Sequence, residues 1–223
     1  MKKILLALTL CFSIFILSSF VVDEKNNSKK KDFYMFLSHF EKTTTPYGIS
    51  IEDLPVSDLK KGQIYNSNVS ALPTEFIPNY SKAKFSRMGP PSIKPIARFY
   101  PSEDHIAVVY SSDLRYGIYK TYQLIVYDFN GNILTKNNKG QERSILIASI
   151  NSQQINTCNI NDQGEIIMET YKIDWKENID EKGFQDNEIL SYTKLAEKIT
   201  QIEENGLIKD FRNIQDVSLI TKA

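Results

Sequence analysis

Residues 119–133, YKTYQLIVYDFNGNI, contain the pattern that decides the fold. Residues 119–127 are rich in aromatic and β-branched side chains, which are typical of a β-strand. Asp128-Phe129-Asn130-Gly131 then forms a turn signal, because Asn and Gly accept the positive φ angle that a tight hairpin demands. The stretch predicts a strand that enters a hairpin and returns as the next strand.

The same plan recurs in residues 160–166 (INDQGEI) and 202–208 (IEENGLI). In both, an apolar strand end precedes acidic or amide residues, a glycine and a new apolar segment. The glycine spacing approaches the repeat of about 40 to 45 residues found in β-propeller blades, but the chain could supply only about three blades. We therefore expect a mainly β protein, an antiparallel β-meander built as a twisted sheet, sandwich or barrel-like fold, with a partial propeller as the alternative.

The neighbouring chain supports a meander. All eight prolines lie between Pro46 and Pro101, so nothing interrupts regular strand pairing afterwards. No segment there has the length and pattern of a crossover helix, which argues against parallel βαβ units. The strand-like segments are residues 93–100, 105–111, 119–128, 133–136, 144–150, 155–160 and 165–175.

The two ends of the domain have other patterns. Phe33, Phe36, Leu37 and Phe40 recur at helical spacing and predict a short helix with Asp32 as its N-cap. Residues 188–204 fit either a helical stripe or strands around a hairpin, and their β-branched content favours strands. We predict a single β-rich domain over residues 32–223, with an irregular proline-containing part (32–92) followed by the β-meander (93–211).

The N-terminus has the composition of an export signal. Lys2 and Lys3 precede the apolar run of residues 4–22, and a polar linker follows at residues 23–31. The best cleavage site follows Ser19, although the run is nearly long enough to remain as a membrane anchor. We expect residues 1–22 to be a signal peptide or anchor. The protein would then be periplasmic, in the outer cell envelope or secreted, or else anchored in the inner membrane.

Composition excludes several functional classes. The 27 basic and 27 acidic residues give no net charge, which argues against nucleic-acid binding. The two cysteines rule out a disulfide scaffold, no four-ligand zinc site can be built from them, and nothing indicates a cofactor. The abundance of Ile, Lys and Asn, together with the lack of paired cysteines, favours a bacterial protein.

Catalytic residues are hard to find in this sequence. His105 follows Glu103 and Asp104, but adjacent strand residues point to opposite faces, so a local hydrogen bond is the simpler interpretation. His39 would flank the apolar helix face as a half-buried residue. Residues 128–139 lack the glycine and glutamate positions of an EF-hand loop, so we predict no metal site there. Cys158 is expected to be a small buried apolar residue.

One aromatic cluster suggests ligand binding. Tyrosines surround a polar loop, and aromatic faces beside polar groups can bind sugars or peptides, although such rings also pack across strands. Trp175 ends a strand beside charged residues and is a second candidate. The candidate ligand-binding residues are Tyr110, Asp113, Arg115, Tyr116, Tyr119 and Trp175.

These observations favour a non-enzymatic binding domain of the cell envelope or of a secreted protein, with a protein or glycan ligand. One alternative is a secreted hydrolase that uses loop carboxylates or His105. Another is a structural or assembly component, which would contact the membrane only through residues 4–22 if these are not cleaved.

Overall fold

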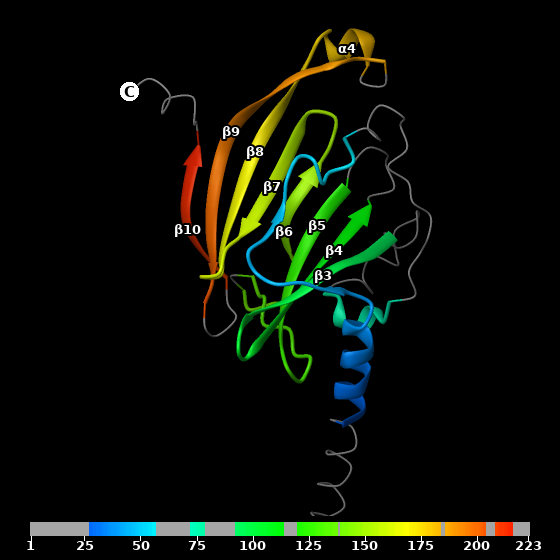
Figure 1. Cartoon of the computed structure of the whole chain (residues 1–223), viewed down its shortest axis with the longest axis vertical. Coiled ribbons are helices and arrows are strands. Elements are labelled where there is room, and N and C mark those ends of the chain that lie inside the picture. Colours follow the sequence, from blue (N-terminus) through cyan, green and yellow to red (C-terminus); the bar gives the residue numbers. More distant parts are fainter. Residues whose placement is uncertain are drawn as a thin grey trace, which may run out of the picture.

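The computed structural model describes residues 27–56, 72–78, 92–113, 120–137, 139–183, 186–203 and 208–215. The protein is mainly β, with one mixed sheet of ten strands that does not close. Consecutive strands lie side by side across this sheet (Figure 1). The expected antiparallel meander is therefore confirmed, and of the arrangements considered it takes the form of a single twisted sheet.

The elements follow one another in a simple order. A helix covers residues 27–37. The strands are β1 (Glu41–Lys42), β2 (Tyr47–Ile49), β3 (Ser92–Ser102), β4 (His105–Asp113), β5 (Lys120–Asp128), β6 (Ile145–Ile150), β7 (Gln154–Ile160), β8 (Glu165–Trp175), β9 (Ile189–Ile202) and β10 (Ile208–Gln215). Two short helices complete the described fold, η1 (Thr74–Phe76) and α4 (Ile179–Lys182).

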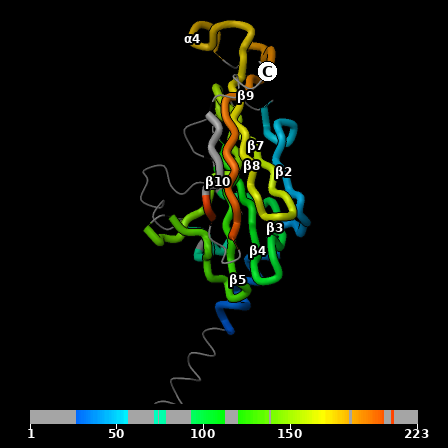
Figure 2. The backbone as a smooth tube through the Cα atoms, turned by 90° about the vertical axis from the view of Figure 1, so that its left-hand side faces the viewer, coloured from blue at the N-terminus to red at the C-terminus, as the bar shows by residue number. Residues whose placement is uncertain are grey.

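Strands β3 to β10 pair antiparallel in chain order, whereas the first two strands pair elsewhere. Strand β1 runs parallel to β3, and β2 pairs antiparallel with β7. Residues 41–49 thus link the β3 edge of the sheet to its middle. In Figures 1 and 2 the helix of residues 27–37 and α4 lie at opposite ends of the sheet.

Three tight turns in the described chain share one hydrogen-bond pattern. In the turn of residues 128–132, Asp128 Oδ1 accepts from the backbone N–H of Asn130 and Asn132, at 2.8 and 2.9 Å. Asn137 and Asn161 accept the equivalent pairs of N–H groups in their own turns. Gly131, Gly140 and Gly164 occupy the fourth position with φ of 76°, 72° and 76°. The side-chain acceptor and the glycine together explain why these sequences reverse the chain.

Two apolar clusters lie on the two faces of the sheet. On one face, Phe33 and Phe36 of the first helix are fully buried against Tyr127, whose hydroxyl donates to the Phe76 carbonyl at 2.6 Å. On the other face, residues such as Phe99, Leu124 and Ile147 form a second buried cluster with Ile49. Burial of both faces of β4 and β5 explains their almost unbroken apolar sequences.

Several local expectations need correction. The chain is already helical at residue 27, so residues 27–31 are not a linker, and Asp32 lies within the helix rather than at its N-cap. Residues 133–136 contain only isolated bridges at Ile133 and Lys136, because the turn at residues 137–141 follows at once. His39 is exposed.

Other expectations hold or lie outside the described structure. Within the ambiguous segment 188–204, Ile189–Ile202 form strand β9 rather than a helix, as their β-branched content indicated. Residues 1–26, which include the predicted export signal, and residues 204–207, which include the third predicted turn, lie outside the described residues.

Gly131 lies against the first helix, which makes its substitution a test of the packing. A Cβ atom at Gly131 would lie 2.7 Å from Phe33 Cγ, whereas one at Gly140 would meet nothing within 4 Å. Gly131→Ala is expected to lower the free energy of unfolding by about 3 kcal/mol, from backbone strain and overpacking together. Gly140→Ala introduces the backbone strain without the overpacking, and it should lower the free energy of unfolding by about 1 kcal/mol. Urea denaturation compares them, and equal losses would contradict the contact with Phe33.

Candidate ligand-binding groove

The groove begins where two neighbouring strands separate. β6 and β7 pair only at Ser149–Asn156 and Ile150–Ile155. Further along, the same edge of β7 pairs with β2, through residues 158–160. In the described ladders, residues 145–148 of β6 therefore pair with β5 alone. This divergence opens a wedge between β6 and the sheet formed by β7 to β10.

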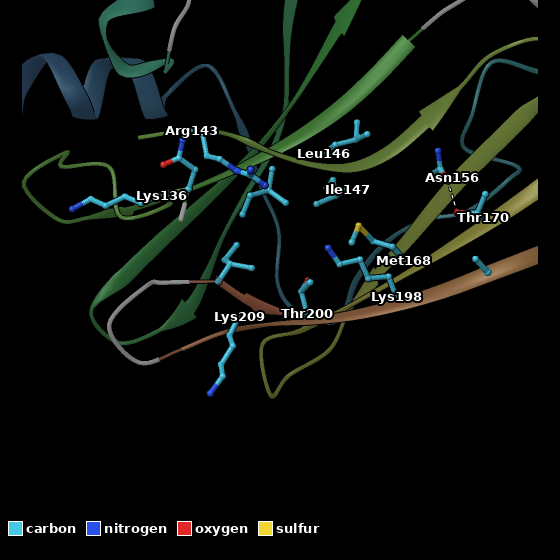
Figure 3. Close-up of a pocket in the computed structure, with 14 residues that line it drawn as sticks. Lys136, Arg143, Leu146, Ile147, Asn156, Met168, Thr170, Lys198, Thr200 and Lys209 are labelled. Atoms are coloured by element: carbon cyan, nitrogen blue, oxygen red, sulfur yellow. Dashed lines mark hydrogen bonds between the residues drawn. The ribbon is translucent and has the colours of Figure 1, made fainter. Parts of the chain in front are cut away.

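A cavity of about 770 Å³ occupies this wedge. Its walls are β6 with the preceding hairpin of residues 136–143 on one side, and β8, β9 and the start of β10 on the other (Figure 3). The lining residues are Lys136, Asn137, Arg143, Ile145, Leu146, Ile147, Asn156, Met168, Thr170, Ala196, Lys198, Thr200, Ile208 and Lys209.

The two walls present different parts of the sheet. β8 contributes Met168 and Thr170, and β9 contributes alternate residues from Ala196 to Thr200, so these strands show one face to the groove. β6 contributes the three consecutive residues 145–147. The register of β6 with β5 shifts between Leu146 and Ala148, so a bulge interrupts the alternation of side chains there.

The charge of the groove has one sign. Lys136, Arg143, Lys198 and Lys209 line it, and no Asp or Glu is among the lining residues whose side chains the structure describes. Within the described chain, Lys136 and Arg143 make no ion pair with a carboxylate, whereas Lys209 Nζ lies 4.0 Å from Glu203 and points away from the other lining side chains (Figure 3). Glu142 pairs with Lys136 through the hairpin backbone but lies outside the lining. The groove is therefore an electropositive site.

Polar groups in the groove are held by a short hydrogen-bond chain. Thr170 Oγ1 donates to Asn156 Oδ1 at 2.7 Å, and Asn156 Nδ2 donates to Ser149 Oγ at 2.7 Å (Figure 3). The Asn156 amide is thus oriented before any ligand arrives. Beside it, Leu146 is 44% exposed and Met168 is half-buried, so the site combines cations with apolar surface.

The opposite face of β8 and β9 is acidic and only partly neutralised, by Lys194. Glu169 and Glu197 are cross-strand partners, and Lys194 Nζ donates to both, at 2.8 Å for Glu197 Oε2. Burial alone would raise the pKa of Glu169, but hydrogen bonds from Lys194 and Tyr171 outweigh it and lower that pKa below its usual value. The same burial and the Glu169 hydrogen bond raise the pKa of Tyr171 to about 12. These residues form a structural ion network.

The structure describes Tyr110 and Trp175 of the sequence-predicted binding residues with their side chains. Tyr110 is buried against the first helix side of the sheet, and its hydroxyl donates to Gln123 Oε1 at 2.9 Å. Trp175 is half-buried against the cluster on the other face, and its indole N–H donates to the Ser152 carbonyl at 3.0 Å. It lines a separate cavity of about 410 Å³ with Ile173 and Leu195.

The other predicted site residues lie at the end of β4 or outside the described residues. Asp113 ends β4, where its backbone pairs with Lys120. Arg115, Tyr116 and Tyr119 lie outside the described residues. Tyr110 and Trp175 therefore do not converge on one ligand, and the interpretation of the tyrosines as cross-strand packing holds for Tyr110.

The two other potentially reactive side chains considered in the sequence, His105 and Cys158, are buried in the fold. His105 is buried, and its Nδ1 lies 2.8 Å from Ser102 Oγ, which is the local hydrogen bond expected from the sequence. Cys158 is buried, and this burial raises the pKa of its thiol to about 12. Among the described residues, no group of three or more His, Cys, Asp or Glu side chains is placed to hold a metal.

Sequence reasoning missed the groove because its cations come from distant segments. Lys136 and Arg143 flank the Asn137-centred turn, whose Asn-x-x-Gly pattern matches the two recognised turns and could have identified that hairpin. Lys198 and Lys209 belong to strands far along the chain, and their approach to the hairpin depends on the curvature of the sheet.

Comparisons with known proteins do not extend this description. No family model, curated protein or solved structure matches the chain. Of the helices in the described ranges, none is both long and apolar enough to cross a membrane.

The ion network predicts a pH-dependent effect. Lys194→Met leaves Glu169 and Glu197 facing each other and should lower the free energy of unfolding by about 1 kcal/mol at pH 7. The lowered pKa of Glu169 means that its stabilising contribution is present above the unfolded carboxyl pKa and is lost as pH falls through the folded pKa. The loss in the variant should therefore shrink in acid.

Urea denaturation at pH 7 and near pH 3 measures this difference. Lys172→Met is the matched control, since Lys172 pairs with the carboxylate of Asp174 and is more exposed than Lys194. If the free energy of unfolding of Lys194→Met differs from that of the unsubstituted protein by the same amount at both pH values, the contribution assigned to ionised Glu169 is contradicted.

Proposed function

We propose that the protein is an exported, non-enzymatic binding domain of the bacterial cell envelope or secreted space, and that it takes a protein or glycan ligand in the groove between β6 and β8 to β10. The supporting observation is the described part of the lining, in which four cations accompany oriented amide and hydroxyl groups and no carboxylate. Such a site favours an anionic ligand, because opposite charges attract at the partly dehydrated surface of a groove.

A binding role fits the described acids and bases better than a hydrolase does. The hydrogen bond between His105 and Ser102 leaves the histidine without a described carboxylate to orient it as a general base. Glu169 has a lowered pKa, whereas a carboxyl that serves as a general acid near neutral pH needs a raised one.

The proposal predicts retention by polyanions that depends on two groove cations. In affinity electrophoresis through polygalacturonate or poly-glutamate, Lys136→Ala/Arg143→Ala should migrate more freely than the unsubstituted protein. Lys172→Ala/Lys176→Ala removes the same charge from exposed lysines outside the groove and should change retention much less. Added salt should weaken retention by screening.

Two results of this experiment would contradict the proposal. Equal losses in the two double variants would indicate non-specific charge attraction, and release of reducing ends from polygalacturonate would indicate an enzyme.

The export part of the proposal has its own test. Fractionation of producing bacteria with N-terminal sequencing should place a chain that begins near Phe20 outside the cytoplasm. An intact N-terminus in the membrane fraction would support the anchored alternative instead. An intact chain in the cytosol would contradict export.

A further inference from the structure

The first helix, residues 27–37, leaves large apolar side chains exposed on the face that points away from the sheet. Its inner residues Phe33 and Phe36 are fully buried, whereas Tyr34 and Met35 are 44% and 54% exposed. The inner face already holds the helix on the sheet, so the fold does not need apolar residues on the outer face. Their presence there indicates a contact outside the described fold.

A third exposed apolar residue, Tyr100 of β3, lies at the same end of the molecule. Lys29 Nζ donates to Asn132 Oδ1 at 2.6 Å, so the start of the helix lies on the turn of residues 128–132. Phe129 of that turn stacks on Tyr100, which is 43% exposed, with 6.3 Å between the ring centres. Three of the five exposed large apolar side chains of the described residues therefore gather around the helix instead of being scattered.

The exposed part of the helix is also basic. Residues 29–31 are three consecutive exposed lysines, and the half-buried Asp32 is the one acid among residues 27–39. The exposed acid and lysine of β1 offset each other, and two further exposed acids, residues 103–104, belong to the β3–β4 turn rather than to the helix. Lysines beside exposed tyrosine and methionine are typical of a surface that meets lipid headgroups.

The position of the helix in the chain indicates a lipid rather than a protein partner. The apolar run of residues 4–22 is followed closely by the helix, which has begun by residue 27. The five peptide units between residues 22 and 27 span at most about 18 Å. While the run occupies a bilayer, either as a signal peptide before cleavage or as an anchor, the helix is held at the membrane surface. A lipid surface is therefore what this end of the molecule meets first.

We propose that the outer face of the first helix binds an anionic lipid surface. Lys30 and Lys31 contact lipid phosphates. Tyr34, Met35 and Tyr100 enter the boundary between the headgroups and the acyl chains. The end of the sheet that carries α4 then points away from the membrane (Figure 1). None of these five residues lines the groove, so the inference goes beyond the proposed function.

The first test measures binding to vesicles of two compositions. The protein is the mature form that begins near Phe20, which keeps every described element, since these start at residue 27. Co-sedimentation should show binding to phosphatidylcholine vesicles that contain about one quarter phosphatidylglycerol, and weaker binding when salt is added. Binding to pure phosphatidylcholine should be at least tenfold weaker, on the order expected for loss of two lysine contacts. Equal binding to both compositions, or to neither, would overturn the proposal.

Two double variants test whether the helix lysines carry the attraction. Lys30→Gln/Lys31→Gln should weaken binding to the anionic vesicles about tenfold or more. Lys172→Gln/Lys176→Gln removes the same charge from exposed positions near the α4 end and should bind as the unsubstituted protein does. Equal losses in the two double variants would mean that overall charge, and not the helix, determines binding, and would overturn the assignment.

A second pair of variants tests the apolar contact. Met35→Gln keeps the length and helix propensity of the side chain but makes it polar, and it should weaken vesicle binding about fivefold. Leu190→Gln is the matched control, since Leu190 is 65% exposed on β9 near the α4 end, and it should have no effect. Thermal unfolding checks that each variant folds. Loss of binding in both variants, or in neither, would overturn the insertion of the helix face.

Amide hydrogen exchange gives a readout that needs no substitution. Anionic vesicles should slow exchange in residues 27–39 and leave residues 189–195 unchanged. Loss of vesicle binding in Lys136→Ala/Arg143→Ala as large as in the helix variants would place the lipid in the groove and overturn this inference. If polygalacturonate is retained through the groove but no vesicle binds, the lipid inference fails and the proposed function stands.

Discussion

The structure depends on how one strand edge is shared. The edge of β7 pairs with β6 through two residues and then with β2 through three. A strand edge can pair with only one neighbour at each point along its length, so the arrival of β2 forces β6 away from β7. This competition opens the wedge, leaves residues 145–148 paired on one side in the described ladders, and sets β8 to β10 as the opposite wall.

Charge is distributed unequally over the two faces of the β8–β9 pair. On one face Lys194 joins Glu169 and Glu197, so the two carboxylates are held by one shared cation. On the groove face, Lys136 and Arg143 have no carboxylate partner within the described chain. Paired charges contribute mainly to the fold, whereas cations without such partners are available to an incoming ligand. The contrast explains why the groove, and not the acidic face, is the better binding site.

Sequence reasoning succeeded where the structure is locally determined and failed where it depends on strand position. The turns at Asp128 and Asn161 followed from an acceptor side chain and a glycine three residues later, and β9 followed from β-branched residues. Tyr110 and Trp175 were separate candidate binding residues, and the sequence pattern could not place either of them on a face of the sheet. Tyr110 packs beneath the first helix, and Trp175 packs against the cluster on the opposite face. The residue types in each strand gave no information about which face of the sheet Tyr110 and Trp175 occupy.

By itself, the sequence determined the strands, their antiparallel order and the tight turns between them, because these depend on side chains within a few residues of one another. Only the tertiary structure decided that residues 47–49 would pair with residues 158–160, and that cations from a hairpin and two later strands would line one cavity. Such pairings join segments far apart in the chain through backbone groups that every residue possesses. For this reason no local pattern of side chains records them.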